Sequence, residues 1–278
     1  MTTTIPRASL LGLPAELRLK IYDFTLLADV DCRVIDDIDH SKDSNGTHAT
    51  LIPNPRADLA LAIPWLNLLL TCRIISSELR SYLRESACLK HNENRTYVLD
   101  LKVLGSQVQK PRRTIIWRRI PCAPNEANCL VMNVSTRPEP GPWTEGGPAS
   151  LARALHQVLN HTVHLGPRMV RDTLLEKHME LQDLLINVEI GSTCSSPAIG
   201  CDSDPKFNWG LFKGAWTKVS RTGFLFGYFE LIRLKNNENE EVEVRPQWQK
   251  VPSVPGHWRN YGYDWGIESL QCAGYFTL

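Results

Sequence analysis

The chain has 278 residues, of which 42% are hydrophobic and 22% charged, and its formal net charge is +1. This composition is typical of a globular protein whose core is large enough to fold without disulfides or metals. The near-zero charge excludes a general attraction to nucleic acid or anionic membranes, and no apolar run is long enough to span a bilayer. The first residues lack a basic region followed by a continuous apolar run, so we expect no signal peptide and an intracellular location, cytoplasmic or nuclear.

Residues 10–27 predict a capped amphipathic helix. Pro14 suits the first helical position, and Glu16 places negative charge at the positive end of the helix dipole. The apolar residues fall into two stripes, one of Leu13, Leu17, Ile21 and Phe24 and the other of Leu19, Tyr22 and Leu26. A helix that is apolar on two sides needs two covering partners. These are either two parts of its own domain or its own domain and another protein.

The next segment, residues 28–63, is polar and irregular. Within it, residues 32–38 and 49–53 are candidates for a short hairpin, with an open loop as the alternative. A second helical region begins near Pro64 and runs to about residue 86. Its apolar stripe recurs at intervals of three and four residues and consists of Cys72, Ile75, Leu79, Tyr82 and Leu83.

After residue 91 the pattern changes to short runs rich in β-branched residues, which predict strands. These runs are residues 96–104, 113–120, 128–134 and 183–190. Between the last two, a helix begins at about Ser150 and ends at Gly166 and Pro167, with residues 168–185 as a candidate for further helix. Its apolar face consists of Leu151, Leu155, Val158, Leu159 and Val163.

The aromatic half of residues 210–234 predicts a strand or a buried segment, and residues 231–246 predict a hairpin around Asn236–Glu240. We therefore predict an α+β fold in two parts. Residues 1–90 form a helical region with an irregular insertion at residues 28–63. Residues 91–278 form a mixed α/β domain with an aromatic-rich C-terminal tail.

The segment LLGLPAELRLKIY resembles the opening helix of F-box domains, which carries a Leu-Pro pair, a Glu shortly after it and an Ile further on. Together with LLLTCRIISSELRSYL, it is similar to a group of F-box-like proteins abundant in filamentous fungi. TYVLDLKV and LARALHQVLNHTVHLGP resemble later segments of that group. The positions that match the motif are Leu10, Leu13, Pro14, Glu16, Leu17 and Ile21.

The resemblance implies that the N-terminal helices bind a Skp-type adaptor and that the rest of the chain recruits a protein substrate to a Skp–cullin–F-box ubiquitin ligase. This chain departs from a compact F-box because residues 28–63 separate its first two helices. The expected function is thus a non-enzymatic protein–protein interaction adaptor without a cofactor. The alternatives are a scaffold whose F-box-like helix is only core, and an enzyme without a recognisable motif. Exposure of Leu10, Leu13, Pro14 and Ile21 favours docking, whereas complete burial favours the scaffold.

Three further patterns have an ordinary and a functional interpretation. The basic run between Lys102 and Arg119 contains Trp117, but an exposed strand edge or loop with solubilising charges explains it better than a nucleic-acid site. The histidines at positions 156, 161, 164 and 178 lack metal-ligand spacing and are interpreted as surface or capping residues. The eight cysteines are scattered, and Cys122/Cys129 and Cys194/Cys201 are spaced more widely than in a zinc knuckle, so we expect reduced thiols.

The C-terminal tail is the candidate surface for the unknown protein substrate, because tryptophan, tyrosine and arginine are the residue types that dominate protein interfaces. The candidate residues are Trp248, Trp258, Arg259, Tyr261 and Trp265. The competing interpretation is that these rings pack onto the α/β body.

Overall fold

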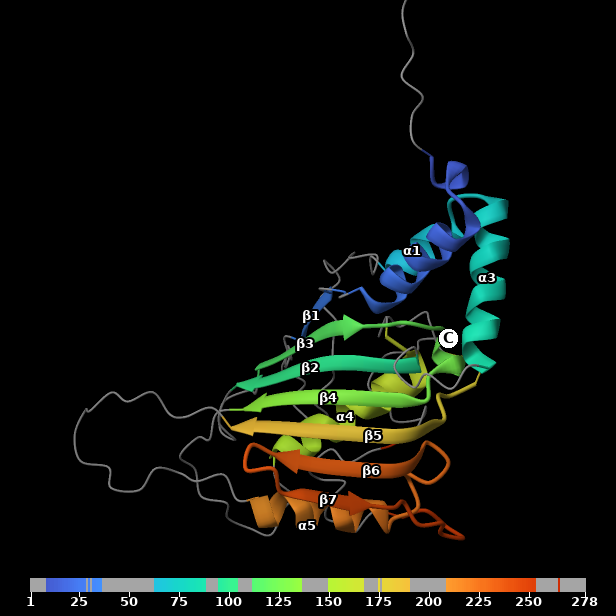
Figure 1. The fold of residues 1–278 in the computed structure, drawn as a ribbon. Coiled ribbons are helices and arrows are strands. Elements are labelled where there is room, and N and C mark those ends of the chain that lie inside the picture. Colours follow the sequence, from blue (N-terminus) through green and yellow to red (C-terminus); the bar gives the residue numbers. More distant parts are fainter. Residues whose placement is uncertain are drawn as a thin grey trace, which may run out of the picture.

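The computed structural model describes residues 9–28, 30, 32–36, 63–88, 95–104, 112–136, 150–167, 175, 177–190, 209–253 and 265. Its helices are the short η1 (Leu10–Gly12) and η3 (Pro124–Glu126), and α1 (Ala15–Leu27), α2 (Pro64–Leu69), α3 (Arg73–Cys88), α4 (Ser150–Leu165) and α5 (Trp209–Ser220). Its strands are β1 (Cys32–Asp36), β2 (Thr96–Leu104), β3 (Arg112–Arg119), β4 (Cys129–Thr136), β5 (Leu181–Ile190), β6 (Phe229–Asn236) and β7 (Glu241–Val244) (Figure 1).

The strands form one seven-stranded sheet in the order β1-β3-β2-β4-β5-β6-β7. The four strands β2, β4, β5 and β6 are parallel. At one edge β3 and then β1 are added antiparallel, and at the other edge β7 pairs antiparallel with β6. Parallel neighbours require crossover connections, and α4 and α5 provide them between β4 and β5 and between β5 and β6. The fold is therefore α+β with a parallel centre.

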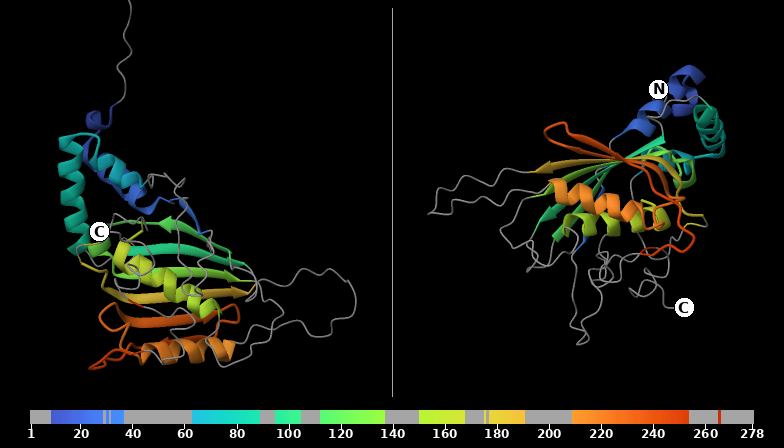
Figure 2. Two further views of the ribbon diagram at one scale, coloured as in Figure 1. Left: turned by 180° about the vertical axis from the view of Figure 1, so that it is seen from behind. Right: turned by 90° about the horizontal axis from the view of Figure 1, so that it is seen from below.

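Helices α4 and α5 lie on the same face of the sheet (Figure 2). The strands bury alternate side chains toward them, as β4 shows by its regular alternation of buried residues with half-buried or exposed ones. On α4, all members of the predicted apolar face, Leu151, Leu155, Val158, Leu159 and Val163, are at most 3% exposed. The main core thus lies between this helical layer and one side of the sheet. The opposite side, called the open face below, is not covered by any described helix.

The N-terminal helices α1, α2 and α3 pack together near the sheet edge formed by β1 and β3 (Figure 1). Hydrogen bonds connect this helical unit to the sheet region. The Trp65 indole N–H on α2 donates to the Ile120 carbonyl at 2.7 Å, and the N–H of Val30, which follows α1, donates to the Arg118 carbonyl at 2.8 Å. Tyr22, Leu79 and the sheet residues belong to one cluster of buried side chains. The core therefore runs without interruption across the predicted boundary near residue 90.

The structure confirms most of the predicted elements. Strands β2, β3, β4 and β5 overlap the four predicted runs, α4 begins at the predicted Ser150, and β6 and β7 form the predicted hairpin. Gly166 adopts a left-handed φ of 69° immediately after α4, as a glycine that ends a helix does. Turn chemistry and period-two alternation are local signals, which explains why sequence patterns locate these elements well.

Two expectations about helices need correction. The helical region from Pro64 is divided, because the chain leaves the helix after α2, where the Thr71 N–H and hydroxyl both donate to the Leu68 carbonyl, and α3 starts at Arg73. The proposed helix over residues 168–185 is wrong where it overlaps β5, in which Leu184, Ile186 and Val188 are buried and the residues between them are half-buried. Short apolar runs fit both helix and strand, and tertiary pairing decides between them.

The structure also decides the two expectations about the segment after α1 and the aromatic segment of residues 210–234. Residues 32–36 form a strand, but its partner is β3, and the proposed hairpin partner at residues 49–53 lies outside the described residues. Residues 209–220 form α5, with Phe212 and Trp216 buried, and the aromatic residues that follow form a turn and then β6. The strand prediction is therefore confirmed only for the last part of residues 210–234.

Candidate functional site

Helix α1 buries two residues of one predicted apolar stripe, whose third member Leu19 is 40% exposed, and the other stripe is exposed or half-buried. Its side chains Tyr22 and Leu26 are buried in the main core, at 0% and 2% exposure. The other side, called the outer stripe below, consists of the predicted Leu17, Ile21 and Phe24, whereas the predicted Leu13 precedes the helix in an extended conformation. Leu17 is 46% exposed and Phe24 is 76% exposed. Exposed apolar residues grouped on one helix side are typical of a protein-binding surface.

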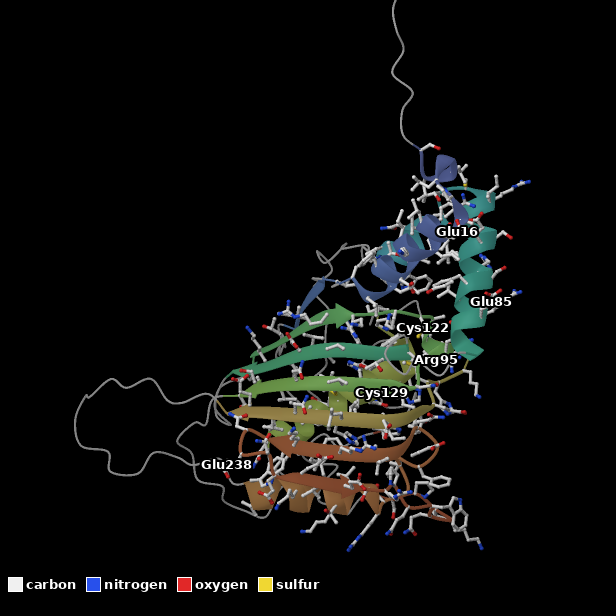
Figure 3. All side chains as sticks on the ribbon, viewed as in Figure 1. Glu16, Glu85, Arg95, Cys122, Cys129 and Glu238 are labelled. Atoms are coloured by element: carbon white, nitrogen blue, oxygen red, sulfur yellow. The ribbon has the colours of Figure 1, made fainter. Side chains whose placement is uncertain are left out.

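No residue of the predicted adaptor-binding set is fully buried, although Leu10 packs against the core. Leu10, Leu13 and Ile21 are half-buried, and Pro14, Glu16 and Leu17 are exposed. Pro14 is the residue before the first helical position, one place earlier than expected, because α1 begins at Ala15. Glu16 lies in the first turn of α1, near the end of the helical unit that is farthest from the sheet (Figure 3).

A hydrogen-bonded network fixes the orientation of α1 on α3. The Arg18 guanidinium donates two hydrogen bonds to the Glu78 carboxylate, at 2.9 and 2.7 Å, and the Tyr22 hydroxyl donates a third at 2.9 Å. The Tyr82 hydroxyl donates to Asp23 on the same side of α1. The bidentate contact sets both the distance and the rotation of the helix. The outer stripe consequently faces away from α3.

Charge in this network supports the same arrangement. Hydrogen bonds from Arg18 and then Tyr22 lower the pKa of the Glu78 carboxyl, which therefore stays ionised. The hydrogen bond to Glu78 raises the pKa of Arg18, and burial raises that of the Tyr22 hydroxyl. Helices α1 and α3 thus pack directly on each other although residues 28–63 separate α1 from α2 in the sequence.

Exposed apolar residues also occur beside α2. Leu70 follows α2 and is 78% exposed, and Ile74 in the first turn of α3 is 57% exposed. Helix α2 contacts both α1 and α3. The exposed apolar residues of this helical unit are Leu11, Leu17, Leu19, Phe24, Leu27, Leu70 and Ile74. The unit therefore offers more apolar surface than α1 alone.

The predicted substrate-binding residues divide into three groups. Trp248 is 65% exposed after β7. Trp265 is half-buried and lies with its ring centroid 4.9 Å from that of His156 and 5.3 Å from that of Tyr228, so it packs onto the body. Trp258, Arg259 and Tyr261 lie outside the described residues.

The histidines of α4 are buried, which corrects their interpretation as surface or capping residues. His156, His161 and His164 are at most 8% exposed. The prediction failed because a second layer, including Trp265 and Tyr228, covers the side of α4 that faces away from the sheet. Burial, with a smaller contribution from His178, lowers the pKa of His164 to about 4. In the part of the chain that the structure describes, no group of three His, Cys, Asp or Glu residues could hold a metal ion.

A polar ladder crosses the middle of the open face, and the sequence analysis missed it. The Arg118 guanidinium donates to the Asp100 carboxylate at 2.6 Å, the Asn133 amide donates to the same carboxylate at 3.0 Å, and the Asn187 amide donates to the Asn133 carbonyl at 3.0 Å. Asp100, Asn133 and Asn187 occupy matching positions of β2, β4 and β5. The signal was an Asp or Asn near the middle of each of three strand runs, flanked on both sides by apolar residues.

This ladder explains how the parallel strands can expose one face. Sheets of parallel strands usually bury both faces. Here the exposed side chains satisfy one another by hydrogen bonds, so the face does not need a covering helix. Arg118, part of the predicted basic run, belongs to this ladder, and Trp117 is buried at 0% exposure. The indole of the basic run is therefore not available to stack on a nucleic-acid base.

The described thiols agree with the expectation of reduced cysteines. Cys72, Cys122 and Cys129 are free. Burial raises the pKa of Cys122 to about 12 and that of Cys129 to about 11, so both remain protonated near neutral pH. Cys122 and Arg95 lie close together at the edge where β2 and β4 begin (Figure 3). A protonated thiol is a poor nucleophile.

No described helix has the length and apolar character needed to cross a membrane. Comparisons with protein-family models, curated proteins and solved structures found no match for this chain. The candidate site is therefore defined by the structure alone. It is the exposed apolar side of α1, and the polar contacts of the opposite side of α1 with α3 keep it at the surface.

Proposed function

We propose that this protein is a non-enzymatic adaptor that resembles an F-box substrate receptor. Its helical unit of α1, α2 and α3 would bind a Skp-type adaptor, and its α/β body would recruit a protein substrate for ubiquitin transfer by the ligase. The observation that carries the proposal is the exposure of the outer stripe. Such an adaptor acts inside the cell, so we place the protein in the cytoplasm or nucleus.

The arrangement of α1 supports docking in two ways. The stripe is formed by a helix that is already folded and oriented by the Arg18–Glu78 contact, so binding would not have to order it. Each leucine or phenylalanine covered by a partner would contribute about 1.5–3 kcal/mol, and a few of them suffice for a specific complex. The chemistry of the protein itself would be positioning, because other subunits perform the transfer.

The test is a binding measurement between the purified full chain and a purified Skp-type adaptor. Leu17→Asp places a charge in the stripe at an exposed position, so the chain should remain folded, which circular dichroism checks. We expect this variant to lose at least about tenfold in affinity, because the complex would bury an unpaired charge. Leu211→Asp is the matched control, since Leu211 is 52% exposed on α5, and it should bind like the original chain.

A well-folded original chain that does not bind the adaptor would contradict this proposal. That result would favour the alternative of a stand-alone scaffold or binding protein, in which Tyr22 and Leu26 anchor α1 in the core and the outer stripe has another partner or none. Equal loss of binding in Leu17→Asp and Leu211→Asp would also contradict it, because the effect would not depend on the stripe.

A further inference from the structure

A second exposed surface lies at the other end of the sheet, where two segments distant in sequence run side by side. The chain turns after α5 into β6, and the segment after β7 returns along this turn. The Gln247 N–H donates to the Ser220 carbonyl at 2.9 Å, and the Ser253 N–H donates to that of Thr222 at 3.0 Å. Gly223 has a φ of 82°, and a Cβ on it would lie 2.7 Å from the Cβ of Gln249. This close approach fixes the two segments on each other.

Large apolar side chains project from this junction. Phe226 in the turn is 49% exposed, and Trp248 and Val251 on the returning segment are 65% and 73% exposed. The Gln249 amide donates to the Arg221 carbonyl at 3.1 Å, which adds a side-chain contact between the two segments. The residues on either side of Gln249, Trp248 and Lys250, are both exposed. The exposed rings are thus held on a fixed backbone.

Positive charge accompanies these apolar side chains. The exposed cations of the two segments are Lys218, Arg221, Arg245 and Lys250. Within the described chain none of them forms an ion pair, whereas Arg233 contacts Glu243 and Lys213 contacts Glu240. Glu243 on β7, two residues before Arg245, pairs with Arg233 instead. The junction therefore has an excess of positive charge that the rest of this hairpin lacks.

We propose that this surface binds an acidic segment of a protein partner in which Asp or Glu side chains flank an aromatic or aliphatic residue. The surface, called the basic aromatic corner below, consists of Lys218, Arg221, Phe226, Arg245, Trp248, Lys250 and Val251. The partner's carboxylates would pair with the cations, and its apolar residue would lie against Trp248 and Phe226. Tryptophan and arginine are the residue types that contribute most to protein interfaces. Under the proposed function, on which this identification of the partner rests, the acidic segment belongs to the substrate.

The shape of the corner favours a protein segment over the other anionic partners. Helices that bind membrane surfaces present a continuous apolar face, whereas here three apolar side chains stand on a turn and on the segment beside it. A nucleic acid is bound by cations that follow its phosphates over several nucleotides, whereas these cations alternate with apolar side chains along two short segments. A peptide that combines carboxylates with an apolar side chain matches both features.

Fluorescence anisotropy with the full chain tests the proposal. The probe is a labelled short peptide that alternates glutamate with leucine and phenylalanine, and the reference peptide has glutamine in place of each glutamate. We expect the acidic peptide to bind at least about tenfold more tightly than the reference, and less tightly as salt is added. Trp248→Ala and the double variant Arg245→Glu, Lys250→Glu should each weaken binding by about tenfold or more.

The matched control is Lys102→Glu, which changes an exposed charge on the open face and should leave binding unchanged. Equal binding of the two peptides, or equal binding by the corner variants and the control, would overturn the proposal. So would tighter binding to phosphatidylserine vesicles or to a single-stranded oligonucleotide than to the acidic peptide. Leu17→Asp should bind the peptide normally, and Trp248→Ala should bind the Skp-type adaptor normally. Failure of one proposal can thus be distinguished from failure of the other.

Discussion

Helices α1 and α4 carry apolar residues on more than one side, yet the fold covers them differently. Nearly every described side chain of α4 is buried, because the sheet lies on one side and the layer with Trp265 and Tyr228 on the other. On α1 only Tyr22 and Leu26 are buried. The two helices show that an amphipathic pattern identifies the side that meets the core. It does not tell whether the remaining sides meet water, a second layer or a partner.

The largest expected difference is between leucine-to-alanine substitutions on α4 and on α1, measured as the change in the free energy of unfolding. Leu155 on α4 is 0% exposed, so Leu155→Ala should lower the free energy of unfolding by about 2–5 kcal/mol. Leu17→Ala on α1 should change it by less than about 0.5 kcal/mol, because the side chain is already largely in water. Urea unfolding of both variants measures the difference. Similar losses would mean that the outer stripe contributes to the core.

The second prediction concerns the pH dependence of stability, to which His164 on α4 contributes. In the folded protein the pKa of His164 is about 4, so the side chain stays neutral until the pH approaches that value. In the unfolded chain the same side chain takes up a proton below about pH 6.5. The unfolded state therefore binds more protons between these values, and the free energy of unfolding should fall as the pH is lowered through this range. His164 should account for a loss of about 2 kcal/mol by pH 5.

The variant His164→Phe, which keeps a ring of similar size, isolates this contribution. Its free energy of unfolding should fall less between pH 7 and pH 5 than that of the original chain, as urea unfolding at each pH would show. Any pH dependence of the free energy of unfolding that remains in the variant comes from other titratable side chains. An identical pH dependence in both proteins would show that His164 is not responsible.

A local effect is expected from the network that holds α1. Glu78→Gln keeps the size of the side chain but removes the charge that pairs with Arg18. We expect faster amide hydrogen exchange in α1 and unchanged exchange in α4, because only α1 depends on this contact for its orientation. Glu85→Gln on α3 is the matched control, and it should leave exchange in α1 unchanged. Faster exchange in both helices would indicate general destabilisation instead.

The elements of this fold could be predicted where local patterns suffice. Strands β2 to β5, the β6–β7 hairpin and α4 follow from alternation, β-branched residues and a terminating glycine. The pairing of β1 with β3 and the burial of His156 and His164 depend on contacts between distant segments, which one sequence does not reveal. The α5 helix was missed because Trp209, Phe212 and Trp216 have strand-like aromatic character but meet the core at helical spacing.

The candidate sites were predicted to a similar extent. The motif residues from Leu10 to Ile21 were identified from the sequence, but the network that orients them was not, because Arg18 and Glu78 are 60 residues apart. Of the predicted tail residues, Trp248 is exposed and Trp265 packs on the body. The cations beside Trp248 come partly from α5 and the turn after it. Hydrogen bonds and the close approach of Gly223 to Gln249 bring the two segments together.

The side-chain contacts of α1 have a consequence for how the polypeptide could be divided. Helix α1 and strand β1 are held by α3 and β3 through the Arg18–Glu78 contact and a strand ladder, and these contacts do not require the peptide bonds between residues 37 and 62. A chain cleaved in that interval should therefore survive as a complex of two fragments, and the fragments expressed separately should reassemble at sufficient concentration. The protein would then behave as a natural split pair, in which the smaller piece carries the outer stripe.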